Sequence, residues 1–370
     1  MKRILIASVL KPINDPRAYA KLALSLRETN KYHLNIIGFF AKNTPKDPNP
    51  VFTTIFSKHR LHYSRWLVPF SFLKHVKSYK PDLVVVTTFE LLPFAVWAKK
   101  RYGFKLIYDV QENYALNART HKTLPLNLGQ LAAIAITYIE SKAARHVDHF
   151  LLAEKCYQEE LGFLRNYTVL ENKYPGETTQ TAPYQLDLTK PFEFLISGTL
   201  AEVYGIEAAV NWFKTIRQKW PHARLHIIGH ITTKSFGKRL QYQIKDNPQI
   251  RLTGSSTPLP YSQIRAAVKM ADIILLPYQQ TTSIRYKIPT KLFESLALAK
   301  PIIHSPNQLL EQLTAEFTAG LGLDFEDLDN AAVNFEAFFN NTFYQKQPDI
   351  SLTWASESTK WTALVDKLIP

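Results

Sequence analysis

The amino-acid sequence predicts an α/β protein built from two doubly wound, Rossmann-like domains that face a central cleft. Short apolar runs of strand length alternate with longer amphipathic stretches along the chain, which is typical of parallel α/β sheets. A segment rich in proline and threonine, 172–191, interrupts this alternation once and is interpreted as a hinge loop. With 370 residues and 46% hydrophobic content, the chain is long enough for two domains.

Each half of the chain supplies its own set of predicted strands. The strands expected in the first half are 3–9, 34–40, 82–88, 105–110 and 149–153, and those in the second are 192–198, 223–229, 250–254, 271–278 and 300–304. The last segment, 351–370, has helical spacing with Trp354, Trp361, Leu364 and Leu368 on one side. These patterns predict an N-terminal domain at 1–172, a linker at 173–190, a C-terminal domain at 191–348 and a final helix at 349–370 that packs back on the N-terminal domain.

The positive charge is concentrated in the first half of the chain. Residues 1–170 contain 25 Lys and Arg against 12 Asp and Glu, whereas residues 171–370 contain 20 against 19. An anionic partner, either a membrane or a nucleic acid, is therefore expected for the first half. The longest apolar stretch, 128–139, is too short to span a bilayer and ends at Glu140. Cys156 is the only cysteine, which excludes an internal disulfide, fits a reducing cytoplasm and leaves no cysteine-based metal site.

The segment KIPTKLFESLALAKPII (287–303) combines a helix start with two charged side chains on one face. Pro289 suits the first helical position, and the free N–H groups of a first turn attract anions. Lys291 adds a full positive charge there, and Glu294 lies one turn further along the same face. A phosphate near Lys291 would leave Glu294 placed to accept hydrogen bonds from ribose hydroxyls. The alternative is an exposed Lys–Glu ion pair with no ligand.

The order of the motifs resembles the GT-B glycosyltransferases, and in particular the large retaining family 4. In the second half the motifs are ISGTLAEVYGI (196–206), HIIGH (226–230), RLTGSS (251–256) and the helix that starts near Pro289. In the first half they are NDPRAYAKLALSLRE (14–28), LIYDVQENY (106–114) and VLENKYP (169–175). The resemblance covers most of the chain, and its strength comes from the order of the motifs rather than from any one of them.

This resemblance implies a metal-independent, retaining transfer of a sugar from a nucleotide-sugar to an acceptor. The C-terminal domain would bind the UDP- or GDP-linked donor, and no cofactor beyond this donor is expected. The resemblance implies that Lys291 stabilises the diphosphate leaving group and Glu294 binds the ribose. The donor-binding residues it implies are Gly198, Thr199, Gly229, His230, Gly254, Tyr286, Thr290, Lys291 and Glu294.

Several positions depart from the family pattern. Tyr286 replaces the first of two glutamates, and Thr199 and Tyr204 stand where many members carry an arginine and a lysine. Gln111 replaces a histidine near the donor sugar, which leaves Glu112 as the nearest ionisable group and a candidate catalytic residue. The alternative for Glu112 is a carboxylate that caps the next helix.

The N-terminal domain is expected to bind the acceptor. Asp15 and Pro16 have the residue types of a helix cap and a first helical position. Arg17 would then face the interdomain cleft and contact the acceptor or a phosphate. The predicted acceptor-binding residues are Asp15, Arg17 and Gln111.

The stretch 58–80 is basic and aromatic, with six Lys and Arg, three His and no acidic residue. It resembles an interfacial membrane anchor, and the predicted membrane residues are Arg65, Trp66, Phe70, Phe72 and Lys74. The alternatives are an ordinary amphipathic helix with its aromatic side in the core, or a site for single-stranded nucleic acid. No nucleic-acid recognition motif accompanies the stretch, so a nucleic-acid partner is not expected.

The expected function is therefore a cytoplasmic glycosyltransferase, peripheral at the inner face of the cell membrane, that makes a cell-surface polysaccharide or glycolipid from a glycan or lipid-linked acceptor. Two alternatives remain open: a nucleotide-sugar 2-epimerase with the same fold, and a catalytically silent GT-B module that binds a glycan or a partner enzyme. A Rossmann dehydrogenase is disfavoured because neither domain begins with G-x-G-x-x-G.

Overall fold

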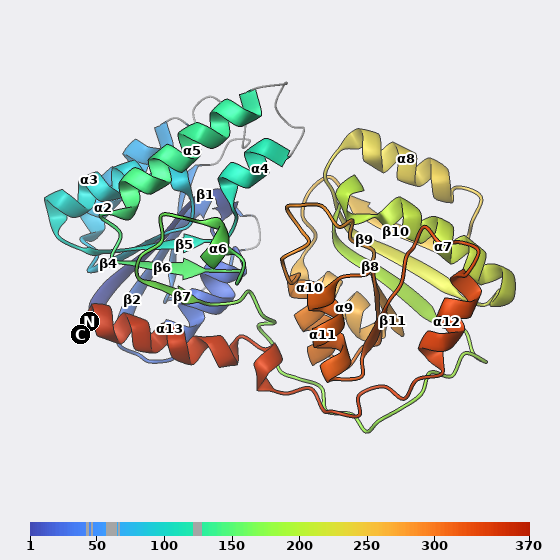
Figure 1. Ribbon diagram of the computed structural model, residues 1–370. Coiled ribbons are helices and arrows are strands. Elements are labelled where there is room, and N and C mark those ends of the chain that lie inside the picture. Colours follow the sequence, from blue (N-terminus) through green and yellow to red (C-terminus); the bar gives the residue numbers. More distant parts are fainter. Residues whose placement is uncertain (42–43, 46, 57–64, 66, 121–127) are drawn as a thin grey trace. The chain divides into compact units, whose positions relative to one another are not determined.

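The computed structural model describes residues 1–370 except 42–43, 46, 57–64, 66 and 121–127, and the chain forms two compact units (Figure 1). Unit 1 comprises Met1–Pro175 and Trp354–Pro370, and unit 2 comprises Gly176–Thr353. The sequence-based domain ranges 1–172 and 191–348 fall inside units 1 and 2.

Unit 1 contains a seven-stranded parallel sheet in the order β3-β2-β1-β4-β5-β6-β7 among the described residues. The bounds of its strands are β1 (Lys2–Pro12), β2 (Tyr32–Phe39), β3 (Val51–Phe56), β4 (Leu83–Val86), β5 (Lys105–Val110), β6 (His149–Leu152) and β7 (Tyr167–Val169). Its helical elements are η1 (Arg17–Ala23), α1 (Leu24–Arg27), α2 (Val68–Tyr79), η3 (Phe89–Leu91), α3 (Leu92–Tyr102), α4 (Tyr114–Thr120), α5 (Leu128–Ala144), α6 (Tyr157–Glu160) and α13 (Ala355–Leu368).

Helices cover both faces of this sheet. Because successive side chains of a strand point to opposite sides, each strand contributes to two separate cores. On β1, Leu5 and Ala7 belong to the core under α2, α3 and α5, whereas Ile4 and Ile6 belong to the core under α1 and α13. The C-terminal helix α13 completes the second core with fully buried Trp361, whose indole N–H donates to the carbonyl of Leu22 at 2.9 Å.

Unit 2 contains a six-stranded parallel sheet in the order β10-β9-β8-β11-β12-β13 among the described residues. Its strands are β8 (Glu193–Leu200), β9 (Arg224–Ile231), β10 (Ile250–Ser255), β11 (Ile273–Leu276), β12 (Ile302–His304) and β13 (Gly320–Gly322). Its helical elements are η4 (Glu202–Tyr204), α7 (Ile206–Lys219), α8 (Lys234–Ile244), α9 (Tyr261–Met270), α10 (Thr290–Ala297), α11 (Gln308–Glu316), α12 (Ala331–Phe339) and η5 (Ile350–Leu352).

Each sheet has one position where the strand order reverses. In unit 2, β8 pairs with β9 on one side and with β11 on the other, so the connections leave in opposite directions at this point. Ligands of doubly wound sheets bind beyond the carboxyl ends of the strands at such a switch point. The end of β8 and the segment that follows β11 are therefore where a site is expected in unit 2.

All ten predicted strands are present, with ends that differ by up to three residues. The sequence pattern does not predict β3, β7 or β13, which are short strands with mostly half-exposed side chains. Strands of this kind lack the continuous apolar run of a central parallel strand, because only part of their surface is covered.

Candidate functional site

Three glycines lie side by side at the carboxyl edge of the unit 2 sheet. Gly198 of β8 pairs with Gly229 of β9, which in turn pairs with Gly254 of β10. A Cβ at Gly229 would lie 1.7 Å from the carbonyl oxygen of Gly198, so no side chain fits between these two strands. This edge therefore exposes backbone where side chains would otherwise project, which allows a ligand to approach closely.

The segment after β11 brings Lys291 onto this glycine edge. Helix α10 begins at Thr290, one residue later than predicted, because Pro289 keeps an extended conformation at the N-cap. No side chain caps this helix, so the N–H groups of its first turn have no side-chain acceptor. Gly198 has a φ of +100°, and a Cβ there would lie 2.2 Å from Nζ of Lys291. The ammonium group thus sits directly over Gly198.

The environment of Lys291 is unusual for a lysine. Burial lowers the pKa of its ammonium group below the ordinary value, while Tyr204 and Glu294 act in the opposite direction. Within the described parts of the chain, Nζ of Lys291 has no hydrogen bond or ion pair at bonding distance. A partly desolvated cation beside an uncapped helix start creates a positive potential that attracts anions.

Glu294 lies one turn further along α10 and is almost fully buried, with 4% of its surface exposed. Its Oε1 accepts a 2.6 Å hydrogen bond from the hydroxyl of Tyr261, the first residue of α9. The exposed Lys–Glu ion pair that the sequence left open is not observed, because Glu294 is buried. Tyr261 thus contacts a predicted site residue, although no sequence motif includes it. The only signal is its position, the start of the helix that follows the glycine-containing strand β10.

The other predicted donor-binding residues lie at the ends of β8 and β9, in the β11–α10 loop and at the start of α10. Thr199, which directly follows Gly198, is exposed, and Thr290 is half-buried at the first position of α10. His230 follows Gly229 and places its Nε2 3.1 Å from the carbonyl oxygen of Ser256, which orients the imidazole ring. Tyr286 is exposed and lies in the β11–α10 loop with the guanidinium of Arg285 4.5 Å from its ring centroid.

Asn307 is a second residue that the sequence did not reveal. Its side-chain amide donates to Oε1 of Gln280 at 2.7 Å and to the carbonyl of Arg285 at 2.9 Å, both in the β11–α10 loop. Its Oδ1 accepts from the first N–H groups of α11. One asparagine therefore caps α11 and fixes the loop that leads to Lys291.

In unit 1, Arg17 and Asp109 form a buried ion pair. Both nitrogens Nε and Nη2 of Arg17 donate to the Asp109 carboxylate at 2.7–3.0 Å, and Nη1 donates to the carbonyl of Leu170 at 2.9 Å. Gln111 donates to the same carboxylate at 2.8 Å. The observed contacts of Arg17 and Gln111 are thus internal to unit 1, and their acceptor-binding role stays a prediction.

Asp15 caps the first helix, as its residue type indicates. Its Oδ1 accepts hydrogen bonds from the backbone N–H groups of Arg17 and Ala18, both at 3.1 Å. This contact fixes the start of η1, and an additional contact of Asp15 with an acceptor stays a prediction.

Glu112 lies just beyond the end of β5 and is partly exposed. Its carboxylate accepts from Nζ of Lys11 at 3.4 Å and from the amide of Asn117 at 3.1 Å. The alternative that Glu112 caps the next helix is wrong, because Asn113 accepts the hydrogen bond from the Leu116 N–H instead. Glu112 therefore remains an accessible carboxylate at the carboxyl edge of the unit 1 sheet.

The predicted membrane residues separate into different environments. Phe72 was expected to face a membrane, and this is wrong because its side chain is fully buried in the core between α2 and the sheet. Phe70 and Lys74 are exposed on α2, whereas Arg65 forms an ion pair with Glu90. Trp66 lies outside the described residues. Among the helices the structure describes, none combines the length and hydrophobicity needed to cross a bilayer.

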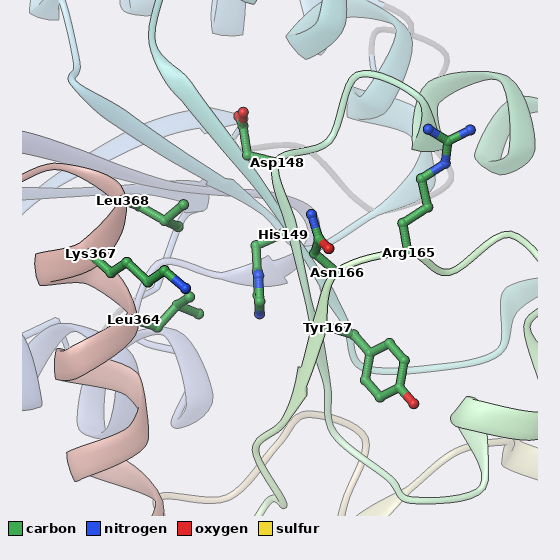
Figure 2. A pocket seen from close by; sticks show the side chains of 8 residues that line it. All are labelled: Asp148, His149, Arg165, Asn166, Tyr167, Leu364, Lys367 and Leu368. Atoms are coloured by element: carbon green, nitrogen blue, oxygen red, sulfur yellow. The ribbon is translucent and has the colours of Figure 1, made fainter.

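A pocket of about 480 Å³ lies in unit 1 near the start of β6 and β7 and the end of α13 (Figure 2). It is at the amino edge of the sheet, opposite to the edge that carries Glu112. The polar groups of two lining residues are already bonded: Asp148 accepts from Lys99 at 2.6 Å, and His149 contacts Thr168 at 2.8 Å. None of the predicted site residues lines this pocket.

Comparison with known proteins finds a family match in the part of the chain that contains these residues. The family model described as glycosyl transferases group 1 matches residues 191–337, which include the glycine edge and α10. No protein of curated function matches the sequence.

Solved structures with a similar fold cover almost the entire chain. Sucrose-phosphate synthase from Thermosynechococcus elongatus is 12% identical, with a TM-score of 0.68 over 100% of this chain and 99% of that one. HepE from Anabaena in complex with UDP and glucose is 11% identical, with a TM-score of 0.63 over 99% and 100%. UDP-GlcNAc 2-epimerase from Methanocaldococcus jannaschii is 13% identical, with a TM-score of 0.58 over 99% and 100%. The chain therefore has the GT-B fold, and residues 191–337 of its C-terminal unit match the glycosyl transferases group 1 family model.

Proposed function

We propose that this protein is a retaining glycosyltransferase that moves a sugar from a nucleoside-diphosphate sugar to a glycan or lipid-linked acceptor. The observation that carries the proposal is the ammonium group of Lys291, which lies over Gly198 at the uncapped start of α10 without an anionic partner at bonding distance among the described residues. The family match over residues 191–337 supports sugar transfer as the general chemistry.

The charge at this site suits the leaving group of such a reaction. In the transfer, the bond between the anomeric carbon and the diphosphate oxygen breaks, and its electron pair stays on the diphosphate. The acceptor oxygen forms the new bond to the anomeric carbon on the face that the diphosphate leaves, and it passes its proton to the departing diphosphate oxygen. Lys291 and the N–H groups of the first turn of α10 stabilise the negative charge that grows on the diphosphate, so this proposal requires no metal ion.

Glu294 is proposed to accept hydrogen bonds from the ribose hydroxyls. Its carboxylate already accepts the hydroxyl of Tyr261 through Oε1, which fixes its orientation before a ligand binds. Gly229 and His230 are proposed to border the base. The donor is expected to carry uridine or guanosine, and the neighbour HepE was solved with UDP and with UDP-glucose.

Unit 1 is proposed to bind the acceptor, with Glu112 as a catalytic group and Asp15, Arg17 and Gln111 as acceptor-binding residues. The excess of basic residues in 1–170 supports an acceptor that is itself anionic or held at an anionic membrane. We place the protein in the cytoplasm, peripheral at the inner membrane face, in the synthesis of a cell-surface polysaccharide or glycolipid.

A 2-epimerase is the second candidate, because an epimerase of this kind is among the similar structures. Epimerisation needs acid and base groups at the sugar, and the position of the family histidine holds Gln111, whose amide is bonded to Asp109. Incubation with UDP-sugars distinguishes the two candidates: epimerisation changes the sugar of the nucleotide-sugar without an acceptor, whereas a transferase releases the nucleotide. Neither product would be found for a catalytically silent module.

The decisive experiment is calorimetric binding of UDP, GDP and their sugars to the wild type, Lys291→Met and Glu294→Gln. The control is Lys269→Met, which removes an exposed lysine from the last turn of α9. One nucleotide is expected to bind selectively, and each site variant should weaken it by about 10- to 100-fold through loss of charged hydrogen bonds. The proposal fails if the wild type binds no nucleotide, or if Lys269→Met weakens binding as much as Lys291→Met.

A further inference from the structure

Helices α2, α3 and α5 lie side by side on one face of the unit 1 sheet (Figure 1). Their inner sides share one hydrophobic core with the sheet. Their outer sides are exposed, and the side chains found there are unusual for the surface of a water-soluble protein. We refer to these outer sides together as the α2–α3–α5 surface.

Large apolar side chains are exposed on all three helices. They are Phe70 on α2, Trp97 on α3, and Leu131, Ile134 and Tyr138 on α5, each more than half exposed. The three residues of α5 are spaced by three and four positions, so they form one stripe along that helix. A group of exposed apolar residues of this size on adjacent elements indicates an interaction surface.

The same surface carries positive charge without exposed negative charge. Its exposed basic residues are Lys74, Lys77, Lys100, Arg101 and Lys142, together with Arg145 directly after α5, and none of them forms an ion pair with a described residue. The only acidic residue in the three helices is Glu140, which is buried and accepts a 2.7 Å hydrogen bond from the hydroxyl of Tyr108. On α5, Nζ of Lys142 lies 5.4 Å from the ring centroid of Tyr138, so basic and apolar side chains are in contact.

We infer that the α2–α3–α5 surface docks on a lipid bilayer that contains anionic lipids. Exposed apolar side chains insert among the lipid chains, while the basic residues beside them bind the headgroup phosphates. An ordinary amphipathic helix has charges of both signs on its outer face, whereas this surface offers only positive ones. The sequence predicted a membrane contact only for the stretch 58–80, which includes α2, and the structure adds α3 and α5 to this surface. The inference stands independently of sugar transfer.

The test is co-sedimentation of the full chain with vesicles of phosphatidylcholine alone and of phosphatidylcholine mixed with phosphatidylglycerol. The wild type is expected to bind the mixed vesicles more tightly, and increasing salt should weaken this binding. The apolar variant Leu131→Ser/Ile134→Ser/Tyr138→Ser should bind them at least about tenfold more weakly. The charge variant Lys100→Gln/Lys142→Gln/Arg145→Gln should bind about 100-fold more weakly, from a loss of about fivefold for each of the three charges.

The matched control removes equally exposed apolar residues from unit 2, in the variant Tyr242→Ser/Met270→Ser/Val333→Ser. This control should bind vesicles as the wild type does. The inference is overturned if phosphatidylglycerol does not increase binding of the wild type, or if the control loses as much binding as the apolar variant. It is also overturned if the apolar variant binds as tightly as the wild type, because binding would then be a non-specific attraction between charges. Nucleotide binding should be equal in all variants, so failure here is distinct from failure of the proposed donor site.

Discussion

The ammonium nitrogen of Lys291 lies in the space into which a side chain at residue 198 would project. A Cβ built on Gly198 comes within 2.2 Å of Nζ and 2.3 Å of Cε of Lys291. The two residues are more than ninety positions apart and are brought together because β8 and β11 are neighbours in the sheet. Lys291 can therefore occupy its observed position only if residue 198 has no side chain. Substituting either Gly198 or Lys291 tests this relationship.

The first prediction concerns Gly198→Ala. The methyl group would displace the end of Lys291 from the glycine edge, and the φ of +100° would add backbone strain. Nucleotide affinity should fall by about 10- to 100-fold, as for Lys291→Met, because the same cation is lost from the site. Calorimetry of the variant measures the loss.

Gly103→Ala is the matched control for this variant. Gly103 has a similarly positive φ of +79°, but a Cβ there would have no atom within 4 Å. Both alanine variants should lose about 1 kcal/mol of unfolding free energy from strain, while only Gly198→Ala should lose nucleotide affinity. Equal affinities in the two variants would mean that Lys291 does not need its observed position.

The second prediction follows from the lowered pKa of Lys291. A bound diphosphate favours the charged ammonium group of Lys291 and so raises its pKa. Nucleotide binding therefore takes up a proton when the pH is above the pKa that Lys291 has in the unliganded protein. Nucleotide affinity should consequently fall as the pH rises through that pKa. Calorimetry in buffers of different ionisation enthalpy counts the protons taken up. Lys291→Met should show no such uptake, and persistence of the uptake in this variant would assign it to another group.

The sequence predicted the fold well because the central strands are continuous apolar runs and both sheet faces are covered. It also predicted correctly that Lys291 and Glu294 lie one turn apart on one helix, since this follows from a local pattern. Contacts between distant segments could not be predicted in this way. The Tyr261 hydroxyl that fixes Glu294 and the Asn307 amide that fixes the β11–α10 loop come from other helices, and neither has a signature in the sequence near its partner.

The error at Phe72 has a related origin. Phe70 and Phe72 are two positions apart, so on a helix they point in clearly different directions. The surrounding basic residues of 58–80 do not show which direction faces the sheet. The structure settles this: Phe72 packs with Val68 and Val76 in the core, and Phe70 is exposed.

The third prediction concerns the buried pair of Arg17 and Asp109. The Asp109 carboxylate favours the charged guanidinium and raises the pKa of Arg17, although burial alone would lower it. Arg17→Met would leave the carboxylate charged and buried, which should cost about 3–5 kcal/mol of unfolding free energy in urea. The double variant Arg17→Met/Asp109→Leu should recover a large part of this loss.

The exposed pair of Lys11 and Glu112 gives the comparison for this prediction, because both side chains are substantially exposed. Lys11→Met should change the unfolding free energy by no more than about 1 kcal/mol. If Arg17→Met proved as mild as Lys11→Met, the buried pair would contribute no more to stability than a surface one.

The fourth prediction uses Glu140, the buried acid beneath the α2–α3–α5 surface. Burial raises the pKa of its carboxyl group from 4.5 to about 7, and the hydrogen bond from Tyr108 opposes this only in part. Between these two pH values, Glu140 therefore keeps its proton in the folded protein and loses it in the unfolded chain. The resulting stabilisation is complete below pH 4.5 and is lost as the pH rises to about 7 and beyond.

Glu140→Gln should remove this pH dependence while its amide oxygen still accepts the Tyr108 hydroxyl. The variant and the wild type should be similarly stable near pH 4.5, whereas above pH 7 the variant should be more stable by up to about 3 kcal/mol. Urea unfolding across this pH range measures the difference, with Glu159→Gln as a control at an exposed carboxylate. Parallel stability curves for Glu140→Gln and the wild type would show that Glu140 is ionised in the folded protein, and the α2–α3–α5 surface would then have a negative charge directly beneath it.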